Sequence, residues 1–142
     1  LQAPFAASGI TLTSDLKEVE GRFFPMDVES VVLNLLTNAY FFSKQGSRAR
    51  KVSISTNERK DGERAGVEIV ISDSGPGVSP DLRSQVWKPL FSTKVDEAGR
   101  ATGTELGLSI VDDVVRDLNG TKAVDTDPSL KGARFTIWLP SK

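Results

Sequence analysis

The segment from Val28 to Phe42 limits the possible folds of this chain more than any other, because its apolar residues recur at helical spacing. At about 100° per residue, these apolar side chains share one face of a helix. Asn34 and Asn38 lie together at the border of that face. The sequence therefore predicts a helix that packs in the core and presents two amide side chains, each with an acceptor oxygen, to one cleft.

Alternation of apolar and polar residues predicts several strands elsewhere in the chain. The expected strands cover residues 10–12, 22–24, 52–56, 67–71 and 135–139. The polar sequence KDGER separates the third and fourth of these strands, which indicates a hairpin.

Start and stop signals predict the remaining helices. Asp27 is the expected N-cap of the first helix, and residues 79–80 (Ser-Pro) are expected to open a short one. Apolar spacing over residues 108–118 predicts a second amphipathic helix, which the Asn-Gly pair at 119–120 ends with a C-terminal glycine signal. One sheet with helices packed on one face is the expected layered arrangement.

Two glycine-containing segments follow the first helix. Asp73 ends an apolar strand and is followed by Ser-Gly-Pro-Gly, which is turn chemistry that also lets the backbone approach a ligand closely. Residues 103–107 (Gly-Thr-Glu-Leu-Gly) open the second amphipathic helix, where free backbone N–H groups can bind phosphate.

In this order and spacing, four segments resemble the ATP-binding domain of sensor histidine kinases, within the superfamily of gyrase, heat-shock protein 90, histidine kinases and MutL. They are residues 34–39 (NLLTNA, the N box), 73–77 (DSGPG, the G1 box), 87–94 (WKPLFSTK, the F box) and 103–110 (GTELGLSI, the G2 box). The resemblance covers nearly the whole chain. It implies the Bergerat ATP-binding fold, an α+β two-layer sandwich of a mixed, mostly antiparallel sheet with helices on one face.

The resemblance assigns roles to individual residues. Asn38 would bind the Mg²⁺ that bridges the phosphates of ATP, and Asp73 would accept a hydrogen bond from the adenine amino group. Asn34, which supports Asn38, and Lys94, which would contact the terminal phosphate, are the expected catalytic residues. The expected nucleotide site further includes Phe42, Gly75, Gly77, Thr93, Gly103, Thr104, Leu106, Gly107 and Leu108. Residues 78–102 are expected to form a lid over the nucleotide, with Trp87 as the packing residue that anchors it.

The absent residues indicate the type of reaction. Hydrolytic relatives carry a glutamate at the position of Asn34, and an amide cannot replace it as a general base. Glu29 lies about 180° around the helix from Asn38 and cannot reach the same cleft. We therefore expect phosphoryl transfer instead of efficient hydrolysis. Because the chain contains no histidine, the acceptor is expected on a separate dimerisation domain.

The resemblance thus implies the catalytic domain of a two-component sensor histidine kinase that uses ATP and Mg²⁺. Its expected partners are its own dimerisation domain and a response regulator, in a homodimeric full-length protein. Glu105 replaces a glycine of the G2 box, and Phe41 stands where a phosphate-contacting lysine or arginine is usual. Both departures favour an alternative, a degenerate nucleotide-binding interaction module without catalysis. An anti-sigma-factor serine kinase is another alternative, although the long lid argues against it.

Length and composition agree with a single domain over residues 1–142. The net charge of −1 argues against a nucleic-acid partner. The chain has no apolar run long enough to span a membrane and no cysteine for a zinc site, and we expect a cytoplasmic domain of a soluble or membrane-anchored protein. Since the chain begins with Leu1, we expect it to be part of a longer protein.

Overall fold

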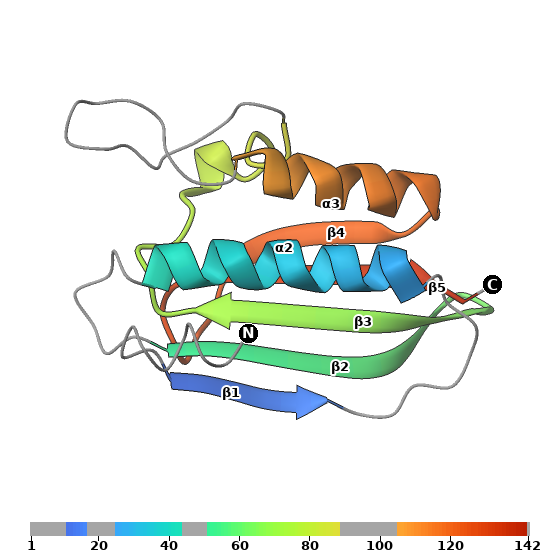
Figure 1. The fold of residues 1–142 in the computed structure, drawn as a ribbon, viewed down its shortest axis with the longest axis horizontal. Helices are drawn as coiled ribbons and strands as arrows, with labels where there is room; N and C mark the ends of the chain where they lie inside the picture. The colour runs from blue at the N-terminus through green and yellow to red at the C-terminus, as the bar shows by residue number, and fades with distance from the viewer. Residues whose placement is uncertain (1–10, 17–24, 44–50, 89–104, 142) are drawn as a thin grey trace.

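The described part of the chain forms one β-sheet with two helices packed on one of its faces (Figure 1). The computed structural model describes residues 11–16, 25–43, 51–88 and 105–141. The strands in these ranges are β1 (Thr11–Leu16), β2 (Lys51–Asp61), β3 (Arg64–Asp73), β4 (Thr121–Thr126) and β5 (Ala133–Pro140). They lie in the order β1-β2-β3-β5-β4, with β1 parallel to β2 and the other neighbours antiparallel. The predicted α+β sandwich with a mixed, mostly antiparallel sheet is therefore confirmed.

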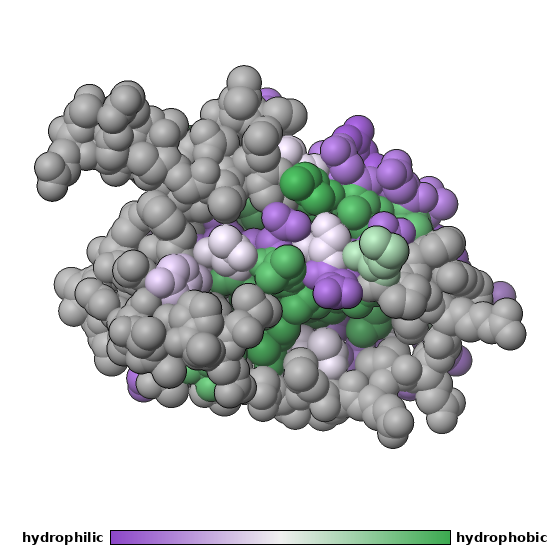
Figure 2. Space-filling view, in the orientation of Figure 1, coloured by the Kyte–Doolittle hydropathy of each residue, from purple (hydrophilic) through white to green (hydrophobic). Residues whose placement is uncertain are grey.

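The helical layer consists of α2 (Pro25–Ser43) and α3 (Glu105–Asp117), which pack against each other and against the sheet. In Figure 2, hydrophilic side chains follow the outer edge of α3, and hydrophobic side chains lie on the side of α3 toward α2. The helix predicted from residues 28–42 is confirmed, but the prediction that Asp27 is its N-cap is wrong. Asp27 lies in the first turn, because Pro25 is already helical. Proline suits a first helical position since its φ is fixed near the helical value and it has no N–H to satisfy.

Buried apolar side chains fill the space between the helices and the sheet. The sheet register places Ile54, Ile71 and Phe135 side by side on three neighbouring strands, and all three are buried. From the helices, Leu35 and Val111 are fully buried and belong to the same hydrophobic core. Because burying one such side chain contributes about 1.5–3 kcal/mol, this core holds the two layers together.

The predicted hairpin is formed by β2 and β3. Asp61 pairs with Arg64, so that Gly62 and Glu63 make the turn between the two strands. Gly62 has a φ of +63°, a left-handed conformation that glycine adopts without strain.

The end of α3 differs from the prediction in its details. The left-handed residue is Asn119, with a φ of 60°, and not the glycine after it. The N–H groups of Asn119 and Gly120 donate to the carbonyl groups of Arg116 (3.2 Å) and Val115 (2.8 Å), which is the Schellman arrangement. Gly120 is required for another reason, because a Cβ at this residue would lie 2.2 Å from the backbone oxygen of Trp138.

One strand has no counterpart among the predicted elements. The sequence of β4, TKAVDT, has a single buried apolar residue, Val124, and this gives too weak an alternation to indicate a strand. The short helix predicted after Ser79 is confirmed as η1 (Pro80–Leu82), a 3₁₀ turn. Ile10 and the strand predicted at residues 22–24 lie outside the described residues. None of the described helices is both long and apolar enough to cross a membrane.

Several segments meet at one end of the sandwich (Figure 1). β3 ends there with Asp73, and β5 begins beside it, since Ser72 pairs with Arg134. The C-terminal half of α2, the N-terminal end of α3 and the turn between β4 and β5 extend to the same end. The described parts of three predicted ATP-binding segments, residues 34–39, 73–77 and 105–110, therefore lie toward the same end of the sandwich.

Candidate functional site

Asp73, the last residue of β3, is a carboxylate buried to 1% exposure. Its Oδ1 atom accepts hydrogen bonds from the backbone N–H groups of Gly75 (2.9 Å) and Ala133 (3.4 Å). Its Oδ2 atom is buried and has no hydrogen-bond partner among the described residues. Since leaving a buried polar atom unpaired is costly, Oδ2 is suited to accept a donor from a ligand.

The environment of Asp73 also changes its acidity. Burial raises the pKa of Asp73 to about 6, because desolvation disfavours the charged carboxylate. The hydrogen bonds from Gly75 and Ala133 act in the opposite direction, and repulsion from Asp127 adds to the rise. Asp73 is thus ionised above neutral pH, when both of its oxygens are acceptors. A carboxyl group with such a shift is typical of a functional site.

Glycine shapes the loop that follows Asp73. Gly75 is buried, and Gly77 has a φ of +79°, which L side chains rarely adopt. Ser74 fixes the loop to β2, because its N–H donates to the carbonyl oxygen of Lys51 (3.0 Å) and its Oγ accepts from the N–H of Lys51 (2.8 Å). Both glycines predicted for the nucleotide site therefore lie in a loop that is anchored to the sheet.

Gly132 and Ala133 are site residues that the sequence pattern did not indicate. A Cβ at Gly132 would lie 2.1 Å from the backbone oxygen of Asp73 and 2.6 Å from its Oδ1 atom, so the close approach requires glycine. Ala133 supplies the second N–H donor to Oδ1. No local pattern reveals a contact between residues so far apart in sequence, and the available signal was a glycine before the last strand.

α2 presents the two predicted asparagines. Asn38 is 2% exposed, and Asn34, one turn earlier, is half-buried. The Nδ2 atom of Asn34 donates to the backbone oxygen of Ser30 at 2.7 Å, which directs its amide oxygen away from Ser30. Glu29 is exposed, in agreement with its predicted position on the other side of the helix.

Of the other predicted site residues, some lie outside the described part of the chain and the rest lie in α2 and α3. Outside the described residues lie Thr93, Lys94, Gly103 and Thr104. Leu106 and Gly107 lie in the first turn of α3, whose first residue is Glu105, and Phe42 lies in the last turn of α2. Leu108 is buried and belongs to the hydrophobic core.

The part of the predicted lid that the structure describes is attached to the core by Trp87. This side chain is buried, and its ring meets that of Phe135 edge to face, with 5.6 Å between centroids. The ammonium group of Lys122 lies 5.6 Å from the Trp87 ring and 2.9 Å from Oδ1 of Asp112. These contacts confirm Trp87 as a packing residue.

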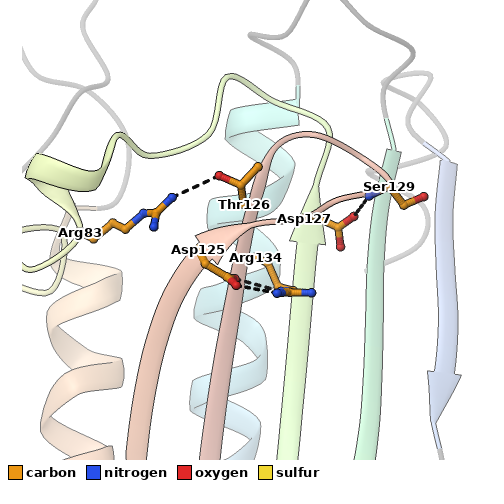
Figure 3. Close-up of polar contacts among 6 residues, drawn as sticks. All are labelled: Arg83, Asp125, Thr126, Asp127, Ser129 and Arg134. Carbon is orange, nitrogen blue, oxygen red and sulfur yellow. Dashed lines mark hydrogen bonds and ion pairs between the residues drawn. The ribbon is translucent and has the colours of Figure 1, made fainter.

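A second contact joins the start of this segment to β4. Arg83, which follows η1, donates to Oγ1 of Thr126 (3.2 Å; Figure 3) and to the backbone oxygen of Val78 (3.4 Å). Arg83 therefore connects the segment after η1 to β4. β4 pairs with β5, whose first residue, Ala133, donates to Asp73.

The described residues include no group of three or more histidine, cysteine, aspartate or glutamate side chains that could hold a metal. Mg²⁺ is often bound by one or two protein oxygens together with the phosphates of a substrate. The amide oxygen of Asn38 is a hard ligand of this type. The residues present thus fit a Mg²⁺ that is bound together with a nucleotide.

Comparisons with known proteins identify similar sequences among ATPases and sensor histidine kinases. Residues 25–142 match the family described as histidine kinase-, DNA gyrase B- and HSP90-like ATPase. The chain is 34% identical over 116 residues to the sensor histidine kinase CpxA of Escherichia coli strain K12, covering 82% of the chain and 23% of CpxA. It is 34% identical over 131 residues to the sensor histidine kinase ZraS of Salmonella typhimurium strain LT2, covering 92% of the chain and 25% of ZraS.

A solved structure is similar over the whole chain. The mycobacterial sensor histidine kinase MprB superimposes with a TM-score of 0.76 at 27% sequence identity, covering 99% of the chain and 88% of the MprB chain. The chain thus spans about a quarter of the length of the two curated relatives and nearly all of this solved structure.

Proposed function

The chain belongs to the family of histidine kinase-, DNA gyrase B- and HSP90-like ATPases, and we propose that it binds ATP with Mg²⁺ and supplies the γ-phosphoryl group to a histidine outside this chain. The relatives that it matches are sensor histidine kinases, and the matched family is their ATP-binding catalytic part. The observation that carries the proposal is the buried Oδ2 atom of Asp73, which has no hydrogen-bond partner among the described residues.

Asp73 would read the adenine base. Its Oδ1 atom is fixed by two backbone N–H groups, so its Oδ2 atom is held in one direction and can accept the amino group of adenine. A base that carries an oxygen at this position would place two acceptors against each other and bind poorly.

Asn38 and the start of α3 would hold the phosphates. Asn38 would contribute its amide oxygen to Mg²⁺, which neutralises phosphate charge, and Asn34 would support it. Free N–H groups in the first turn of α3 would bind phosphate oxygens, together with Thr93, Lys94, Gly103 and Thr104. Phe42, Gly75, Gly77, Leu106, Gly107 and Leu108 would complete the nucleotide site.

The nucleophile would come from another part of the full-length protein. The chain contains no histidine, and an asparagine stands at position 34, where a general base would be needed to activate water. A chain that positions ATP without a nucleophile is suited to phosphoryl transfer to an incoming side chain. We infer that residues 1–142 act as one domain in the cytoplasm, in a homodimeric kinase whose dimerisation domain carries the histidine and whose product serves a response regulator.

Calorimetric titration of the chain with ADP and ATP, with and without Mg²⁺, tests this function. We expect Asn38→Ala to remove the gain in affinity that Mg²⁺ gives, while metal-free ADP still binds through Asp73. Glu29→Gln changes an exposed residue of the same helix and should alter neither value. ATP turnover by the unmodified chain should be negligible. A full Mg²⁺ effect in Asn38→Ala would refute the role of Asn38, and robust turnover would favour a hydrolytic ATPase.

A further inference from the structure

The turn between β4 and β5 is closed around one side chain, that of Asp127. Its Oδ1 atom accepts a hydrogen bond from the N–H of Ser129 (2.8 Å; Figure 3) and another from the N–H of Leu130 (2.7 Å). Its backbone oxygen accepts from the N–H of Lys131 (2.9 Å), and its own N–H donates to the oxygen of Gly132 (2.9 Å). Asp127 therefore determines the shape of the turn.

The second half of this turn contacts Asp73, the carboxylate proposed to accept the amino group of adenine. Gly132 passes so close to Asp73 that a Cβ would overlap its backbone oxygen and its Oδ1 atom, and the N–H of Ala133 donates to the same Oδ1. A change in the shape of the turn would move these two residues away from Asp73. Oδ1 would then lose one of its two fixed donors, and the direction of Oδ2 would no longer be unique.

We propose that Asp127 is a positioning residue for nucleotide recognition: by closing the β4–β5 turn, it holds Gly132 and Ala133 against Asp73 and keeps the Oδ2 atom of Asp73 directed at the adenine amino group. This inference rests on the proposed function and deepens it, since it concerns how the same site selects its base. Asp127 itself makes no contact with the nucleotide in this role.

The charge of Asp127 provides a second, separable effect. Burial acts to raise the pKa of Asp127, but hydrogen bonds from Leu130, Ser72 and Ser129 outweigh it, so the pKa lies below its ordinary value. The ionised Asp127 repels the charge of Asp73 and adds to the raised pKa of Asp73. Asparagine at position 127 keeps an oxygen for the two N–H donors but removes this repulsion.

The experiment measures the affinities of the full chain for ADP and for inosine diphosphate, which carries an oxygen in place of the adenine amino group. At pH 7.5 we expect the unmodified chain to prefer ADP, and Asp127→Ala to lower this preference by about tenfold. Asp127→Asn should restore it. The matched control is Asp125→Asn, on the same hairpin, where the carboxylate pairs with Arg134 (2.9 and 2.5 Å) (Figure 3). Asp125 is not among the groups that shift the pKa of Asp73. This control should keep the preference.

A pH series on Asp127→Asn gives a readout that a loss of stability would not produce. Protonation of Asp73 weakens ADP binding, and removing the repulsion from Asp127 should move this acid-induced loss to lower pH. Asp125→Asn should leave its midpoint in place.

The possible outcomes separate the two claims. An unmodified chain with equal affinity for both nucleotides would overturn the proposed function and this inference with it. A chain that prefers ADP, together with an unchanged preference in Asp127→Ala, would overturn the inference alone. If Asp127→Ala does not fold, Asp127→Ser replaces it, because a serine hydroxyl closes such a turn more weakly than a carboxylate. An unchanged preference for ADP in Asp127→Ser would then overturn the inference.

Discussion

Replacing Asp73 by asparagine should make the protein more stable and, at the same time, abolish its recognition of adenine. The carboxyl group has a pKa of about 6 in the folded protein, against 3.8 for an unperturbed aspartate. Each unit of difference corresponds to about 1.4 kcal/mol. The ionised form of Asp73 therefore lowers the free energy of unfolding by about 3 kcal/mol at pH 7.5, relative to the protonated form.

The sign follows from the direction of the shift. Because the pKa of Asp73 is raised in the folded protein, its protonated form is the one that stabilises the fold. This contribution to the free energy of unfolding is fully present below pH 3.8 and is lost as the pH rises through about 6. An asparagine resembles the protonated form at every pH. The stability difference between Asp73→Asn and the unmodified chain should therefore be larger at pH 7.5 than at pH 4.5, by about 2 kcal/mol.

The net gain at pH 7.5 should be smaller than the full electrostatic term. The oxygen of the new amide still accepts from Gly75 and Ala133, but its nitrogen takes the buried position of Oδ2, where it has no partner among the described residues. We expect a gain of about 1–3 kcal/mol, which corresponds to a rise in Tm of roughly 3–9 °C for a chain of this size.

The same geometry predicts the loss of binding. The amide nitrogen of the variant would face the amino group of adenine, donor against donor, and we expect ADP affinity to fall by about a hundredfold or more. Urea denaturation at pH 4.5 and 7.5, followed by the fluorescence of the buried Trp87 and Trp138, measures stability, and calorimetry measures affinity. A variant that is less stable than the unmodified chain at pH 7.5, or a stability difference independent of pH, would refute the reasoning.

Three further substitutions test other parts of the structure. Gly120→Ala should lower the free energy of unfolding by roughly 2–4 kcal/mol, because its Cβ would lie 2.2 Å from the oxygen of Trp138. Asn119→Gly should change the free energy of unfolding by less than about 1 kcal/mol, because glycine adopts the positive φ of this residue without strain. Equal effects of the two substitutions in urea denaturation would contradict this distinction. Glu105 is the first residue of α3, and a carboxylate at such a position would compete with the phosphates for the helix N-terminus. Glu105→Gly should therefore tighten ATP binding about tenfold and adenosine binding less. Equal changes in the two calorimetric affinities would show that Glu105 does not act on the phosphates.

The elements predicted well are those whose burial repeats with a local period. The apolar residues of α2 recur every three to four positions, and those of β2 and β3 alternate, because each element buries one face against the same core. The sequence did not predict β4, because an edge strand with one buried apolar side chain shows almost no alternation of apolar and polar residues. Asp27 was misplaced because a proline that starts a helix looks, in sequence, like one that ends a strand.

In the candidate site, too, the residues predicted from the sequence are those that occur in local patterns. Short motifs, whose order and spacing are visible along the chain, identify the family. They also predict that Asn38, Asp73 and the glycines after Asp73 bind the nucleotide. The packing of distant segments brings Gly132 and Ala133 against one oxygen of Asp73 and leaves the other oxygen without a partner among the described residues. The raised pKa of Asp73 has the same origin. Desolvation and backbone hydrogen bonding depend on which distant segments pack around a group, and a local sequence pattern does not contain that information.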